Sequence, residues 1–236
     1  MPHHFEADDL SGKQANAQLV RTGLCLRHSD GPLFGVVSRL VHQKGLDIVA
    51  DTARGIVGEG GQIAILGLGD PDTEHMLSRL ARCHRDDIGL LIGFNEPMAR
   101  RIVAASDFCL MPSRFEPCGL TQMQAQRYGS LPIAHRTGGL ADTIDDGETG
   151  FLFSDLSGDG LFAACRLAFE AYDDADVLAG MRKSAMARDF HWSGAAAAYE
   201  QLYRRLAGPT ATQAAGQPSR PRRQARPVNS ALPAAA

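Results

Sequence analysis

The stretch LFGVVSRLVHQKGLDIVADTARGIVGEGGQIAIL, residues 33–66, decides the fold. It begins and ends with short apolar runs, Leu33–Ser38 and Gln62–Leu66, which are typical of buried strands. Between them, Gly45–Val57 carries its apolar side chains mainly on one face of a helix. A strand, a helix and a second strand in this order predict a right-handed crossover that joins two parallel strands.

The same alternation continues toward the carboxyl terminus. Further apolar runs predict strands at Ile88–Ile92, Asp107–Met111 and Leu131–Ala134. Helical patterns fill the gaps at Asp72–His84, Glu96–Ala105 and Gly119–Tyr128. Strands alternating with helices predict an α/β fold, a Rossmann-like doubly wound parallel sheet that is covered on both faces.

Only helical patterns follow the last predicted strand, at Ser157–Tyr172, Ala175–Asp189 and Ser193–Leu206. Near the other end, Ser11 and Gln14 form the pattern of a capping box, which predicts a helix that runs to Gly23. We therefore expect only helices after the last predicted strand.

The composition is that of an ordinary globular protein, with 44% hydrophobic and 22% charged residues in a chain of 236. No apolar run approaches the roughly 18 residues of a membrane span, and the first thirty residues are charged where a signal peptide is apolar. The five cysteines include no Cys-x-x-Cys pair, which indicates reduced thiols without a zinc site. These observations predict a cytoplasmic protein that has no metal and no membrane contact.

Charge separates the body of the chain from its end. Residues 207–236 contain four arginines and no acid, so the first 206 residues carry 20 basic and 27 acidic groups. An acidic body argues against a nucleic-acid-binding domain. The end is rich in Ala, Pro and Arg and predicts disorder, as a solvated terminus more than as a contact for an anionic partner. We predict a folded domain at residues 1–206 and a disordered tail at 207–236.

Ligands of a doubly wound sheet bind beyond the carboxyl ends of its strands, so residues that follow each predicted strand are candidates. Arg39 and Lys44 follow the first strand, five positions apart at a strand-to-helix turn. Two cations there form an anion site suited to a diphosphate leaving group. A solvated pair of surface charges explains the same pattern equally well.

Two glycines, Gly67 and Gly69, follow the second predicted strand. A dinucleotide fingerprint needs a third glycine where Asp72 stands, so an NAD site loses its main support. The pair either lets backbone approach a ligand or only closes the strand, and the second interpretation is favoured.

A carboxylate, Glu116, follows the fourth predicted strand, where it could hold sugar hydroxyls. The amides of Gly119, Leu120 and Thr121 then form a helix amino terminus, which stabilises phosphate. Cys118 at the same place is alternatively a nucleophile. That alternative is disfavoured because no Cys-His-acid set accompanies the thiol.

Three motifs, Ser38–Asp47, Pro112–Gln122 and Arg136–Thr143, together closely resemble bacterial glycogen synthase and plant starch synthase. The resemblance runs from about Asp9 to Leu206. It implies the carboxyl-terminal, nucleotide-sugar-binding domain of a GT-B glycosyltransferase. It also implies retaining transfer of glucose from ADP-glucose to the non-reducing end of an α-1,4-glucan, without a metal or other cofactor.

The resemblance implies that Arg39 and Lys44 balance charge on the departing diphosphate and that Glu116 lies beside the donor sugar. The donor-binding positions are then Gly67, Gly69, Phe94, Cys118, Gly119, Leu120 and Thr121. Phe94 matches an aromatic side chain that stacks on adenine and is often Tyr in the family. Gln124 stands where many related transferases have a second Glu, which favours the glycogen synthase branch over sucrose- or trehalose-type enzymes.

The family's amino-terminal domain, which holds the acceptor site, is not matched by this chain. We therefore expect the chain to supply the donor-binding half and to catalyse very little transfer alone, because catalysis needs donor and acceptor together. The expected partners are ADP-glucose, α-1,4-glucan and a separately encoded amino-terminal half, with no nucleic acid. The alternatives are a non-catalytic nucleotide-sugar-binding module and an inactive truncated synthase.

Overall fold

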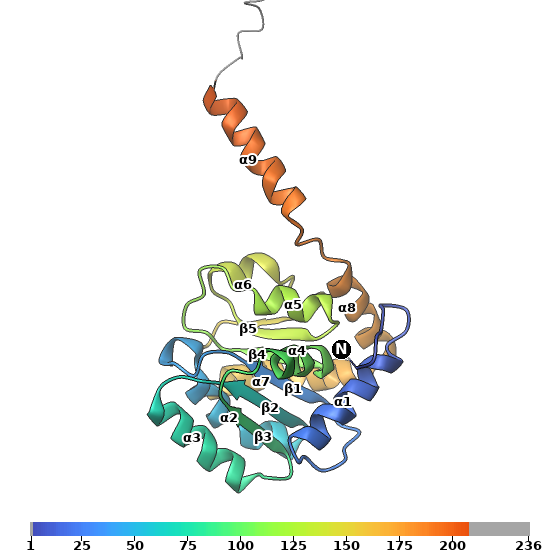
Figure 1. Cartoon of the computed structure of the whole chain (residues 1–236), viewed down its shortest axis with the longest axis vertical. Coiled ribbons are helices and arrows are strands. Elements are labelled where there is room, and N and C mark those ends of the chain that lie inside the picture. Colours follow the sequence, from blue (N-terminus) through green and yellow to red (C-terminus); the bar gives the residue numbers. More distant parts are fainter. Residues whose placement is uncertain (1, 208–236) are drawn as a thin grey trace, which may run out of the picture. The chain divides into compact units, whose positions relative to one another are not determined.

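The computed structural model describes residues 2–207 (Figure 1). The chain divides into two units, Met1–Phe190 and His191–Ala236. The first contains the sheet, and the second contains helix α9 (Trp192–Ala207). From position 208 onward, the tail for which disorder is predicted lies outside the described residues.

The first unit is built around a parallel sheet in the order β3-β2-β1-β4-β5-β6. The strands are β1 (Leu33–Val37), β2 (Gln62–Gly67), β3 (Ile88–Ile92), β4 (Phe108–Met111), β5 (Leu131–His135) and β6 (Phe151–Phe153). The first five confirm the predicted strands to within one residue at each end. The expectation of helices alone after them is wrong, because β6 pairs with β5. Its three residues are too few to show a strand period.

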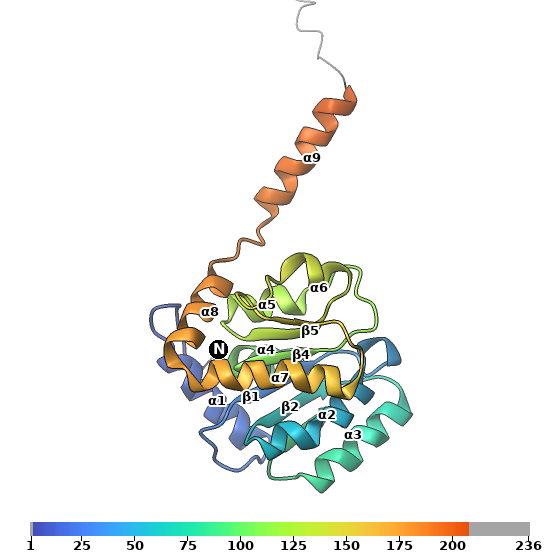
Figure 2. The same ribbon diagram turned by 180° about the vertical axis from the view of Figure 1, so that it is seen from behind.

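Helices cover both faces of the sheet. They are α1 (Ser11–Gly23), α2 (Leu46–Gly58), α3 (Pro71–Cys83), α4 (Glu96–Ala105), α5 (Thr121–Arg127), α6 (Gly138–Thr143), α7 (Gly158–Asp173) and α8 (Ala175–Ala187), with a short 3-10 helix, η1 (His42–Lys44). Helices α1, α4 and α5 lie on one face (Figure 1), and α2 and α7 lie on the other (Figure 2). This arrangement confirms the doubly wound α/β fold. No helix in residues 2–207 is both long and apolar enough to cross a membrane.

Helix α1 begins where predicted, but not through the predicted capping box. Ser11 is already its first helical residue, and no side chain caps the helix at Leu10. The Ser11 N–H instead donates to Asp9 Oδ1 at 3.0 Å. An upstream carboxylate therefore replaces the hydroxyl that the pattern had indicated.

Two stacked rings hold the middle of the sheet. Phe34 in β1 and Phe108 in β4 are register partners, and both are fully buried. Their ring centroids lie 5.3 Å apart, and Phe169 of α7 lies 5.4 Å from Phe34. Burial of a side chain of this size contributes about 1.5–3 kcal/mol, so these contacts hold β1 firmly against β4.

The strand order changes direction between β1 and β4. After β1 the chain continues outward to β2 and β3, and it then returns to build β4, β5 and β6 on the other side. The loops after β1 and β4 therefore diverge and leave a crevice at the carboxyl ends of these strands, where ligands bind in such sheets.

Candidate functional site

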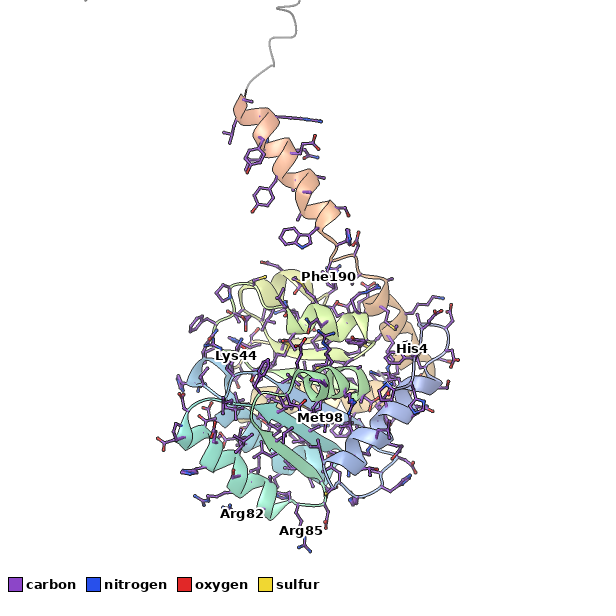
Figure 3. The ribbon with its side chains drawn as sticks, in the orientation of Figure 1. His4, Lys44, Arg82, Arg85, Met98 and Phe190 are labelled. Carbon is purple, nitrogen blue, oxygen red and sulfur yellow. The ribbon has the colours of Figure 1, made fainter. Side chains whose placement is uncertain are left out.

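A cavity of about 180 Å³ lies at this crevice, lined by β1, β4 and the loops that follow them. Three of the predicted site residues line it: Arg39, Lys44 and Thr121. Figure 3 shows Lys44 across the domain from His4, which precedes α1. The structure thus brings the predicted cationic pair together with the start of α5.

Lys44 forms an ion pair with Glu116 beside this cavity. The Lys44 Nζ donates to Glu116 Oε2, and the two side chains are 18% and 9% exposed. Ser113 Oγ donates to the same oxygen at 3.3 Å. Arg39 is exposed and donates to Gln43 Oε1 at 3.1 Å. The site therefore offers one shielded cation beside a carboxylate and one cation that is open to solvent.

A salt bridge that the sequence did not indicate fastens the loop after β4 to α2. Arg114 donates to Asp47 Oδ1 at 2.9 Å and to Oδ2 at 2.6 Å, and it also donates to His42 O at 2.7 Å. These hydrogen bonds lower the pKa of Asp47 and raise the pKa of Arg114. Both groups therefore remain charged at neutral pH, and the loops that carry Lys44 and Glu116 stay joined.

Two further hydrogen bonds join these two loops. The Arg114 N–H donates to Gln43 O at 2.9 Å, and Gln43 Nε2 donates to Phe115 O at 2.9 Å. Gly45 has a left-handed φ of +67°, and a Cβ there would lie 2.0 Å from Pro112 O. Only glycine fits this position, so the sequence Lys-Gly is required for the approach of the two loops.

Gly67 and Gly69 face neighbouring backbone. A Cβ on Gly67 would lie 2.1 Å from Ser38 O, and one on Gly69 would lie 2.2 Å from Leu40 O. This packing accounts for both glycines, and their contact with a ligand stays a prediction. Phe94 follows β3, does not line the cavity and is 89% exposed. Its stacking on a base likewise stays a prediction.

The loop after β4, residues 112–120, extends further than predicted. Helix α5 begins at Thr121 with Leu120 as its N-cap, so the predicted start at Gly119 is wrong. Gly119 has a φ of +76°, which is not helical. Cys118 is exposed, and its Sγ donates to Gly119 O at 3.4 Å. No histidine or carboxylate bonds to this thiol within residues 2–207, which argues against a nucleophile.

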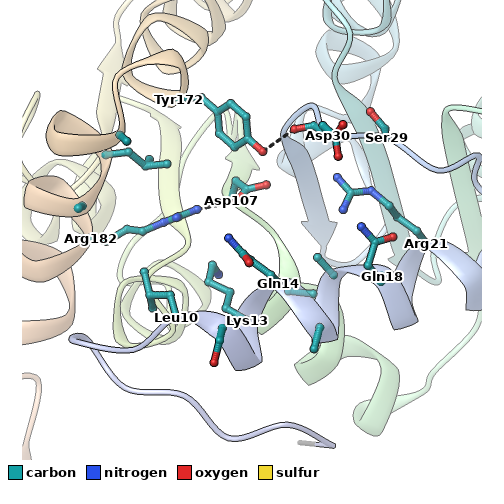
Figure 4. A pocket seen from close by; sticks show the side chains of 17 residues that line it. Leu10, Lys13, Gln14, Gln18, Arg21, Ser29, Asp30, Asp107, Tyr172 and Arg182 are labelled. Atoms are coloured by element: carbon teal, nitrogen blue, oxygen red, sulfur yellow. Dashed lines mark hydrogen bonds and ion pairs between the residues drawn. The ribbon is translucent and has the colours of Figure 1, made fainter.

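A larger cavity, of about 700 Å³, lies near the amino-terminal ends of β1 and β4 (Figure 4). Its cations already have protein acceptors. Lys13 donates to three backbone carbonyls, Arg182 donates to Asp107 Oδ1, and Arg21 Nε donates to Gln62 Oε1. None of the predicted site residues lines this cavity. Its charged groups hold α1 and α8 against the sheet and do not form part of the site at the crevice.

Known proteins resemble this chain over most of its described length. Residues 31–170 match the family described as glycosyl transferases group 1. The chain is 56% identical over 207 residues to glycogen synthase 1 from Bradyrhizobium diazoefficiens, a match that covers 88% of this chain and 45% of the relative. It therefore spans somewhat less than half the length of this relative.

Solved structures show the same likeness. The catalytic domain of starch synthase IV from Arabidopsis thaliana, bound to ADP and acarbose, superimposes with a TM-score of 0.80 and 36% identity. That match covers 85% of this chain and 44% of the other. Sucrose-phosphate synthase from Thermosynechococcus elongatus matches less well, with a TM-score of 0.61 and 26% identity over 79% of this chain and 48% of the other. The higher TM-score and identity of the starch synthase match favour the starch and glycogen synthase branch, which Gln124 also predicted.

Proposed function

The chain belongs to the group 1 glycosyl transferases, and from this premise we propose that it forms the donor-binding half of a glycogen or starch synthase. The proposed reaction moves glucose from ADP-glucose to the non-reducing end of an α-1,4-glucan with retention. An amino-terminal half, outside this chain, supplies the acceptor wall. We place the reaction in the cytoplasm, in keeping with five free cysteines.

The observation that carries the proposal is the Lys44–Glu116 pair at the crevice between β1 and β4. A nucleoside diphosphate at this crevice meets Lys44 on the cavity wall and Arg39 at the open side. Similarity to a starch synthase structure that contains ADP and acarbose supports the same ligand class.

The chemistry that these residues perform is stabilisation of a leaving group. When the bond between the glucose C1 and the diphosphate oxygen breaks, its electron pair stays on the diphosphate. Arg39 and Lys44 stabilise this charge, so we expect transfer without a metal ion. Glu116 pairs with Lys44 and is proposed to accept hydrogen bonds from sugar hydroxyls. Phe94 is proposed to stack on adenine.

Separate binding of donor and acceptor by two halves explains the low activity that we expect of the chain alone. Donor and acceptor must be held in one geometry before glucose can be transferred. Effective molarities for well-placed reacting groups reach about 10⁵ M or more. A chain that holds only the donor loses this advantage, although it can still bind ADP-glucose.

The proposal is tested by mixing the chain with the separately expressed amino-terminal half of the Bradyrhizobium glycogen synthase. We expect the mixture to transfer radiolabelled glucose from ADP-glucose to glycogen in the presence of EDTA, with much less transfer from UDP-glucose. Each half alone should transfer little. Assembly of two folded halves without any transfer would contradict the synthase function and favour a module that only binds the donor.

A further inference from the structure

Gln122, in the first turn of α5, is a fully buried side chain that takes no part in the chemistry above. Its Nε2 lies 2.9 Å from Cys118 O, 3.0 Å from Gly119 O and 3.1 Å from Thr143 Oγ1. The side chain therefore lies beneath the loop of residues 112–120 and ties it to α6.

These contacts fix the direction of the Gln122 amide. A carbonyl oxygen can only accept, so the nitrogen end of the amide must face Cys118 and Gly119. The other end, Oε1, is buried and has no hydrogen-bond partner. An unpaired buried acceptor is destabilising, so it offsets part of what the three hydrogen bonds of Nε2 contribute to the fold.

The N–H groups of these two peptides consequently point away from Gln122. The C=O and N–H of a planar trans peptide are antiparallel. Because the carbonyls of Cys118 and Gly119 face Gln122, the N–H groups of Gly119 and Leu120 face the opposite side. Neither N–H has an acceptor among the residues that the structure describes. Neighbouring free N–H groups of this kind bind anionic oxygens.

Gly119 is the residue that makes this contact sterically permissible. Its φ of +76° is left-handed, and a Cβ would lie 2.5 Å from Gln122 Oε1. A side chain at position 119 would therefore push the loop off the glutamine. The unpaired oxygen thus lies against the one residue of the loop that has no side chain.

We propose that Gln122 is a positioning residue, which orients the N–H groups of Gly119 and Leu120 toward the diphosphate of the donor. This inference rests on the proposed function and adds a role for a residue outside the cationic pair. Gln122 acts through the two peptide groups and does not itself touch the ligand.

The test compares two methionine variants by calorimetric titration with ADP. Gln126→Met is the matched control, because Gln126 is also fully buried on α5 and has an unpaired Oε1, but its Nε2 donates to Thr143 O. We expect Gln122→Met to weaken ADP binding about tenfold, since two donors lose their orientation. Gln126→Met should bind ADP as the wild type does.

A second readout needs only the wild-type chain, in case Gln122→Met does not fold. Titration of ¹⁵N-labelled protein with ADP should shift the amide resonances of Gly119 and Leu120. Three results would each overturn the role of Gln122 and leave the proposed function standing. They are unchanged ADP affinity in folded Gln122→Met, equal losses of affinity in both variants, and unmoved amide resonances of Gly119 and Leu120 at saturation. A wild-type chain that binds no ADP would overturn the proposed function as well, so the two failures are distinguishable.

Discussion

Replacing Lys44 with alanine is expected to weaken ADP-glucose binding about 100-fold. In the proposed site, the variant loses a charge-assisted contact to the diphosphate, and it also leaves the Glu116 carboxylate without its cation beside the anion. Both effects act in the same direction, which places the loss at the upper end for a single hydrogen bond to a charged group. Calorimetric titration of wild type and variant measures the ratio of affinities.

The ion pair also makes Lys44 structurally important, so the variant needs a control. Loss of one partner of a pair this buried should lower the free energy of unfolding by about 3 kcal/mol. The double variant Lys44→Ala/Glu116→Gln removes both charges and should recover most of that stability while binding ADP-glucose weakly. Full recovery of affinity would mean that Lys44 only neutralises Glu116. Lys183→Ala, at an exposed lysine of α8, should change neither quantity.

The stability that Lys13 confers is expected to depend on pH. From pH 7 to pH 9, the difference in unfolding free energy between wild type and Lys13→Met should shift by about 2 kcal/mol in favour of the wild type. Burial lowers the pKa of Lys13 from 10.5 to about 7. The unfolded chain keeps the proton through this range while the folded chain loses it, so rising pH favours the fold. Methionine cannot titrate and lacks this dependence.

Near neutral pH two effects of Lys13→Met oppose each other. The variant leaves the carbonyls of Ala104, Ser106 and Tyr128 without the Lys13 ammonium, but it also removes a charge from the interior. Urea unfolding of both chains at pH 7, 8 and 9 gives the difference directly. A difference that stays constant with pH would show that the folded chain keeps Lys13 protonated, contrary to the shift expected from burial.

The central strands could be predicted because they are short and apolar on both faces. Strands such as β2 are buried along their whole length, so their sequences are continuous apolar runs. Strand β6 could not be predicted in this way. It is defined by pairing with β5, and three residues carry no period of their own. Helix α6 was missed as well, since it begins with two glycines and is only six residues long.

The residues of the proposed site were chosen by their position after predicted strands, and their contacts could not be predicted in this way. Lys44 and Glu116 are 72 positions apart and meet because β1 and β4 are neighbours, an order that alternation of strands and helices does not determine. The Arg114–Asp47 salt bridge and the contacts of Gln122 depend on the same juxtaposition of loops. A periodic sequence pattern reports which face of an element is buried, whereas these interactions depend on tertiary packing.

The most direct test of the donor site is a calorimetric titration of the purified chain with ADP-glucose, with Glu116→Ala as the comparison. Saturable binding at one site, weakened in Glu116→Ala, is the predicted result, because Arg39, Lys44 and Thr121, which line the crevice between β1 and β4, all belong to this chain. Absence of binding by a wild-type chain that circular dichroism shows to be folded would contradict the assignment of a donor site to this half.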